Sequence, residues 1–141
     1  MRTQMFIAAG GNGNRLGAHT CNKPKSLVDV HGRPIIDHII QSGIDANIDD
    51  IVVGVDSGKE ALKERAQLFG VAFESGCVEP LTKAFFHSAK IRGSDLIIGT
   101  NGDTIYYPES LNRVIAALRE NPSASAALLV TKITRPIFSS S

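Results

Sequence analysis

The stretch MFIAAGGNGNR, residues 5–15, decides the fold class of this chain. Its first five residues are apolar and end at a glycine, which is typical of a short strand buried on both faces. A loop rich in glycine and asparagine follows and carries the cations Arg15, Lys23 and Lys25. Ligands of open α/β sheets bind outside the carboxyl ends of the strands, so we expect a ligand at this loop.

The rest of the chain alternates between amphipathic helices and apolar strands. One helix is expected to begin at Pro34 and to end before Gly43, because proline suits the first turn and glycine the position past the last. Further helices are expected at residues 59–69, 81–89 and 111–118. Further strands are expected at residues 51–55, 71–73, 96–99 and 124–131. This order predicts a doubly wound, Rossmann-like α/β domain, in which helices cover both faces of a mostly parallel sheet.

The composition excludes several classes of protein. The chain has 141 residues, which suits one domain, and its 15 basic and 14 acidic side chains leave a net charge of +1. Such a balance gives no electrostatic footprint for nucleic acid or an anionic membrane. Cys21 and Cys77 lack the spacing of a zinc site and suit a reducing compartment. The amino-terminal residues contain neither a signal-peptide core nor a membrane span. We therefore expect a cytoplasmic protein with no nucleic acid or membrane partner.

The glycine-rich loop has the chemistry of a phosphate site. Glycines let backbone N–H groups approach phosphate oxygens closely, and the guanidinium of Arg15 matches phosphate geometry. The loop has no G-K-[ST] sequence, so it is not a Walker A motif. Glycines alone would equally make a tight turn, but the addition of Arg15 and Lys25 favours phosphate.

Two aspartates follow strands of the expected sheet. Asp103 comes after the strand at 96–99, and a carboxylate at that edge, facing a phosphate loop, is a natural Mg²⁺ ligand. The alternative for Asp103 is an Asx-type turn, since Asn-Gly-Asp is strong turn chemistry. Asp56 follows the strand at 51–55 and could reach a nucleotide. We expect it instead to cap the amino-terminal end of the next helix, 57–69.

The loop also resembles a family signature. In sugar-phosphate nucleotidyltransferases the sequence G-G-x-G-x-R-L is followed, after eight residues, by K. The residues at the family's spacings are Gly10, Gly11, Gly13, Arg15, Leu16, Thr20, Lys25 and Leu27. Asp103 matches the family's G-D-x-[IVL] metal-binding aspartate. The resemblance extends from Thr3 to about Pro136. At residues 79–85 the chain departs from the family's base- and sugar-reading segment, with Pro80 in place of glycine.

This resemblance implies a set of site residues. Those that would bind nucleotide are Ala9, Gly10, Gly11, Asn12, Gly13, Asn14, Arg15, Lys25 and Gly102. Among the catalytic residues, Arg15 would hold the β- and γ-phosphates, and Lys25 the α-phosphate and the incoming sugar phosphate. Asp103, the third, would bind Mg²⁺, the expected cofactor. The implied reaction joins a nucleoside triphosphate to a sugar-1-phosphate and releases pyrophosphate.

The resemblance covers only the first part of the family's domain. We expect residues 1–136 to form the nucleotide-binding part and residues 137–141 a short serine-rich tail, as in a domain truncated at its carboxyl end. An apolar edge left there would favour a homo-oligomer. Two alternatives remain: a similar enzyme that acts on phosphocholine, molybdopterin or a sugar-alcohol phosphate, and a non-catalytic module for nucleotide binding or assembly.

Overall fold

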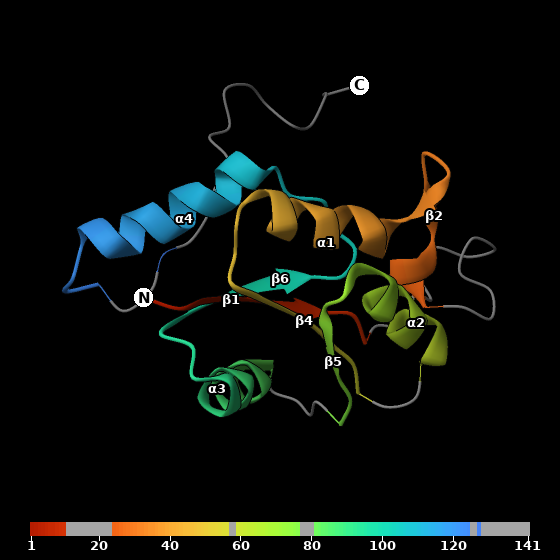
Figure 1. Ribbon diagram of the computed structural model, residues 1–141, viewed down its shortest axis with the longest axis horizontal. Coiled ribbons are helices and arrows are strands. Elements are labelled where there is room, and N and C mark those ends of the chain that lie inside the picture. The colour runs from red at the N-terminus through yellow and green to blue at the C-terminus, as the bar shows by residue number, and fades with distance from the viewer. Residues whose placement is uncertain (11–23, 57–58, 77–80, 125–126, 128–141) are drawn as a thin grey trace, which may run out of the picture.

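The computed structural model describes residues 1–10, 24–56, 59–76, 81–124 and 127. Four parallel strands form the main sheet in the order β5-β4-β1-β6 (Figure 1). Their bounds are β1 Thr3–Ala8, β4 Asp50–Gly54, β5 Ala72–Glu74 and β6 Leu96–Asn101. The helices are α1 Ile35–Asp45, α2 Glu60–Phe69, α3 Leu81–Arg92 and α4 Pro108–Glu120. The predicted doubly wound α/β fold is confirmed.

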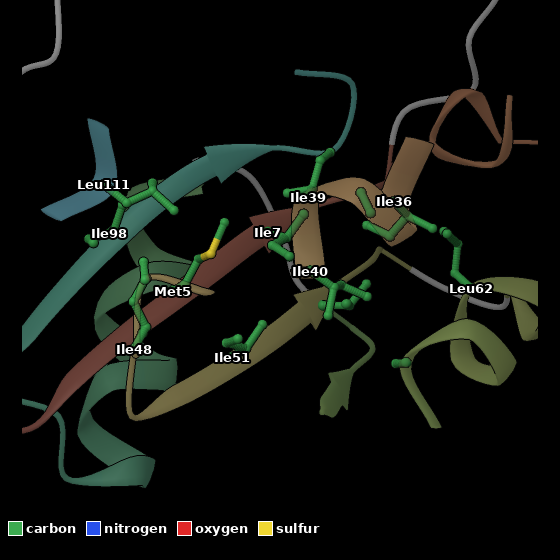
Figure 2. Packing of buried hydrophobic residues seen from close by; sticks show 14 of the residues in the cluster. Met5, Ile7, Ile36, Ile39, Ile40, Ile48, Ile51, Leu62, Ile98 and Leu111 are labelled. Atoms are coloured by element: carbon green, nitrogen blue, oxygen red, sulfur yellow. The ribbon is translucent and has the colours of Figure 1, made fainter. Parts of the chain in front are cut away.

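The strand order places helices on both faces of the sheet. The chain passes from β1 to β4 and β5 on one side, then returns across the sheet to β6 on the other side of β1. Right-handed crossovers therefore put α3 on the face opposite to α1 and α4, as Figure 1 shows. The large core lies on the α1 face. Side chains that Figure 2 labels in it are Met5, Ile7, Ile36, Ile39, Ile40, Ile48, Ile51, Leu62, Ile98 and Leu111.

A smaller core lies under α3 and is built around Phe6. The Phe6 side chain is fully buried, and its ring meets that of Phe85 edge to face at a centroid distance of 5.1 Å. Val52 and Ala84 complete this cluster. Gly54, on the neighbouring strand, leaves the space that the Phe6 ring fills, since a Cβ there would overlap the ring.

The expected end of the first helix is wrong. α1 continues through Gly43 to Asp45, and Gly43 is buried within it. A Cβ at Gly43 would lie 2.6 Å from Met5 Sδ and 2.9 Å from Ile51 Cδ1. The glycine is therefore needed because the helix packs closely on the sheet, and it does not terminate the helix.

A small hairpin precedes α1, and the sequence analysis does not predict it. β2 (Asp29–Val30) pairs antiparallel with β3 (Arg33–Pro34). The two turn residues, His31 and Gly32, have φ of 52° and 81°. Positive φ at both central residues is what a type I′ hairpin turn requires. The His-Gly pair between short extended segments was the available signal.

The expected strand at 124–131 lies outside the described residues except for Ala124 and Ala127, which belong to neither a helix nor a strand. Within the described part of the chain, no helix is long and apolar enough to cross a membrane.

We predict that Gly54→Ala lowers the free energy of unfolding by about 1–3 kcal/mol, because the new methyl group overlaps the buried Phe6 ring. Urea unfolding of the single variants Gly54→Ala and Phe6→Leu and of the double variant would measure this. The smaller Leu side chain should make room for the methyl group, so the double variant should lose less stability than the sum of the singles. Additive losses would contradict the predicted overlap.

Candidate nucleotide site

The candidate site lies at the carboxyl edge of the sheet, around the end of β1. Ala8 is in register with Gly54 of β4 on one side and with Asn101 of β6 on the other. Because the chain runs outward from β1 in both directions, this is the topological switch point of the sheet. Open α/β sheets bind their ligands at such a point.

The ends of β1 and β6 are held close together by a glycine. The Gly102 N–H donates a hydrogen bond to Ala8 O at 2.8 Å, one residue past the end of β6. A Cβ at Gly102 would lie 2.9 Å from both Ala8 O and Ala9 Cα, and it would also overlap the buried Ser26 hydroxyl. Only glycine fits at this position. The close contact between Gly102 and the end of β1 fixes the backbone position from which Asp103 follows.

Lys25 reaches the same place from a different segment. It begins the short 3₁₀ helix η2 (Lys25–Leu27), which is anchored by the buried Ser26 and by Leu27 packed against the core. Its Nζ lies 2.9 Å from Asp103 Oδ2. The two side chains are 35% and 37% exposed, so a ligand can reach both. The structure thus brings together two of the three predicted catalytic residues.

The ion pair changes the acidity of Asp103. The hydrogen bond from Lys25 holds the pKa of the Asp103 carboxyl below its usual value, and the Lys25 charge acts in the same direction. The Thr104 hydroxyl, 3.3 Å from Asp103 Oδ1, lowers this pKa further. Asp103 is therefore ionised at neutral pH, which is the form that a cation requires.

The start of the glycine-rich loop lies against the end of β4. The Ala9 N–H donates to Gly54 O at 2.9 Å, and Ala9 is buried. A Cβ at Gly10 would lie 3.3 Å from Asp56 N and 3.4 Å from Asp56 Oδ1. The beginning of the loop is therefore set between Asp103 on one side and Asp56 on the other.

Five of the predicted site residues gather at this edge: Ala9, Gly10, Lys25, Gly102 and Asp103. The remaining ones lie outside the described residues, and their roles stay predictions: Gly11, Asn12, Gly13, Asn14 and Arg15.

The expected role of Asp56 is wrong. α2 begins at Glu60, its N-cap is Lys59, and no side chain caps it by a hydrogen bond. Asp56 lies too far ahead of the helix for that role, and its carboxylate instead accepts a hydrogen bond from Lys59 Nζ at 3.1 Å. Its position beside Gly10 makes it a further candidate for the site, which the capping interpretation obscured.

A divalent cation fits the donor chemistry of this edge. Among the described residues no three His, Cys, Asp or Glu side chains gather as a metal cage. Mg²⁺ is usually held by one or two carboxylates together with substrate phosphates and water, so the single carboxylate of Asp103 fits a Mg²⁺ ion that a bound substrate's phosphates also ligate.

A doubly wound sheet whose switch point carries a glycine-rich loop, a lysine and an aspartate has the features of a nucleotide-binding α/β domain. Residues 5–139 match the family model described as the MobA-like NTP transferase domain. The chain belongs to this family, and the resemblance to nucleotidyltransferases is confirmed at this level.

Individual proteins that are similar to this chain are named for CMP or for cytidylyl transfer. The chain is 28% identical over 137 residues to CMP-5'-(3-aminopropyl)phosphonate synthase of Streptomyces rubellomurinus, covering 93% of this chain and 21% of that protein. It is 27% identical over 116 residues to 3-deoxy-manno-octulosonate cytidylyltransferase of Coxiella burnetii, covering 78% and 46%. Among solved structures, a cytidylyltransferase of Leptospira borgpetersenii superposes with a TM-score of 0.73 at 18% identity, covering 87% and 51%. This chain thus spans about half or less of their lengths.

We predict that Lys25→Met raises the pKa of the Asp103 carboxyl toward the ordinary value, because the hydrogen bond and the charge that lower it are lost. The carboxyl ¹³C chemical shift of Asp103, followed by NMR across acidic pH, measures this pKa. Lys90→Met, at an exposed position on α3, is the control and should leave it unchanged. An Asp103 pKa that is the same in Lys25→Met and the parent would mean that the pair does not form in solution.

Proposed function

We propose that residues 1–136 are the nucleotide-binding part of a Mg²⁺-dependent nucleotidyltransferase, which transfers a nucleoside monophosphate from a nucleoside triphosphate to a sugar-1-phosphate. The ion pair between Lys25 and Asp103, beside the first residue of the glycine-rich loop, is the observation that carries this proposal. A lysine ammonium and an aspartate carboxylate at one exposed point of the switch region support a phosphate site beside a metal-binding carboxylate.

In this reaction an oxygen of the acceptor attacks the α-phosphorus, and the bond from that phosphorus to the bridging oxygen of pyrophosphate breaks. No covalent enzyme intermediate is required. The Lys25 ammonium turns to the α-phosphoryl oxygens, where charge builds up in the transition state. Arg15 is proposed to hold the leaving pyrophosphate, and the amides of residues 11–14 to hold the triphosphate. Mg²⁺, when bound at Asp103, supplies neutralisation of the phosphate charge.

The names of the relatives support cytidine triphosphate as the nucleotide, since all three proteins compared above are named for CMP or for cytidylyl transfer. Two of the names also favour a second class of acceptor. One contains an aminoalkyl phosphonate and the other a sugar acid, and neither is a sugar-1-phosphate. An acceptor that is an aminoalkyl phosphonate or a sugar acid is therefore the second candidate.

Binding and turnover test the proposal together. Calorimetry with ATP, CTP, GTP, UTP and dTTP, each with and without Mg²⁺, should show Mg²⁺-dependent binding that is tightest for CTP. Pyrophosphate release is then measured with glucose 1-phosphate, phosphocholine, an aminoalkyl phosphonate and 3-deoxy-manno-octulosonate as acceptors. If the folded chain binds none of the five nucleotides, it does not work as a nucleotidyltransferase in this form, and the assembly-module alternative takes its place.

We predict that Lys25→Ala and Asp103→Asn each lower kcat/KM for pyrophosphate release by roughly 100-fold or more, because each removes a charge that acts on the reacting phosphates. Lys90→Ala and Asp45→Asn are matched controls at exposed positions of α3 and α1 and should stay near the parent value. Circular dichroism confirms that each variant is folded. Losses of only a few-fold in both site variants would remove the assigned roles.

A further inference from the structure

Asp56 lies just beyond the end of β4, and Asp103 lies in the equivalent position just beyond the end of β6. Gly54 and Asn101 are both in register with Ala8, and the two aspartates each lie two residues beyond these partners. They therefore flank the end of β1, one on each side. Neighbouring strands lie about 4.8 Å apart, so strands on the two sides of β1 are separated by roughly 10 Å.

The Asp56 side chain is exposed at this edge of the sheet. It is 59% exposed, although the preceding Val55 is buried. A Cβ at Gly10, where the glycine-rich loop begins, would lie 3.4 Å from Asp56 Oδ1, so the carboxylate is beside the start of the loop. The ribose of a nucleotide lies only a few bonds from its α-phosphate, so a nucleotide with its phosphates at Lys25 and Asp103 can bring its ribose to Asp56, a carboxylate on the β4 side of the loop.

Lys59 holds the Asp56 carboxylate in place. Its Nζ lies 3.1 Å from Asp56 Oδ1, and the Lys59 side chain is only 15% exposed. The Asp56 main chain is tied down as well, because Gly76 N–H donates to Asp56 O at 2.8 Å. A carboxylate has about four acceptor positions, so it can bind Lys59 and accept from ligand hydroxyls at the same time. Both links orient the group before any ligand arrives.

We propose that Asp56 accepts a hydrogen bond from a ribose hydroxyl, 2′ or 3′, of the bound nucleotide and thereby favours nucleotides that carry that hydroxyl. An ionised carboxylate accepts hydrogen bonds and donates none, and the ribose hydroxyls are the donors that a deoxyribose partly lacks. In dinucleotide-binding Rossmann folds, too, an acidic side chain reads a ribose hydroxyl. This inference rests on the proposed function, because it requires the phosphates to lie at Lys25 and Asp103.

The test is calorimetric, with Mg²⁺ present, and uses the nucleotide that the parent protein binds best together with its 2′-deoxy and 3′-deoxy forms. The parent should bind at least one deoxy form roughly tenfold more weakly or worse, as expected for a lost hydrogen bond to a charged group. In Asp56→Ala this difference should disappear, because the ribonucleotide loses affinity while that deoxy form does not. Lys90→Met and Asp45→Asn, at exposed positions of α3 and α1, are the controls and should keep the discrimination of the parent. Lys59→Met removes the link that orients Asp56 and should reduce the discrimination.

Each outcome decides a different point. Equal affinity of the parent for all three forms would overturn the role of Asp56 and leave the proposed function standing. Discrimination that persists in Asp56→Ala, or that is lost in Lys90→Met, would also overturn it. Absence of any nucleotide binding by the folded parent would overturn the proposed function and this inference with it.

Discussion

The hydrogen bond from Gly102 N–H to Ala8 O is the constraint on which the site depends. It continues the pairing of β1 and β6 by one residue beyond the last strand position. Because a side chain at this point would overlap the backbone of β1, the two strand ends meet as closely as backbone allows. Asp103 follows directly, and η2 brings Lys25 to it over the buried Ser26. The candidate site is therefore built on strand ends, with Asp103 just beyond β6 and Lys25 on η2 beside it.

Much of the fold could be predicted from the sequence, because its elements follow from periodicity. Buried parallel strands are apolar throughout, and the helices show one apolar face, so both were recognisable. Glycine was the weak point of the reasoning. Gly70 ends α2 with a φ of 69°, as expected, whereas Gly43 lies inside α1. A local pattern cannot distinguish a glycine that ends a helix from one required by a neighbouring strand, because the second reason lies in tertiary packing.

The candidate site was predictable only in part, for a similar reason. The resemblance identified Lys25 and Asp103, and the structure shows the two side chains in contact. No local rule would have paired them, since their contact depends on the strand order. Asp56 was misjudged because an aspartate just before a helical pattern is a normal N-cap, whereas here Lys59 holds that position with a left-handed φ of 63°. The sequence does not reveal that Asp56, two residues beyond the end of β4, lies beside Gly10.

The ion pair itself bears on how the proposed site would work. Ion pairs as exposed as this one contribute only about 0–1 kcal/mol to stability, so Lys25 and Asp103 need not be paired for the fold to hold. Without ligand, the Lys25 ammonium and the Asp103 carboxylate neutralise each other. Under the proposed function, phosphate would bind the first of these groups and the metal the second, and a triphosphate would draw Lys25 away from Asp103. Asp103 stays ionised at neutral pH even without Lys25, because the ordinary pKa of an aspartate carboxyl already lies in the acidic range. The pair would thus open at little energetic cost, and only a ligand carrying both charges would compensate both residues at once.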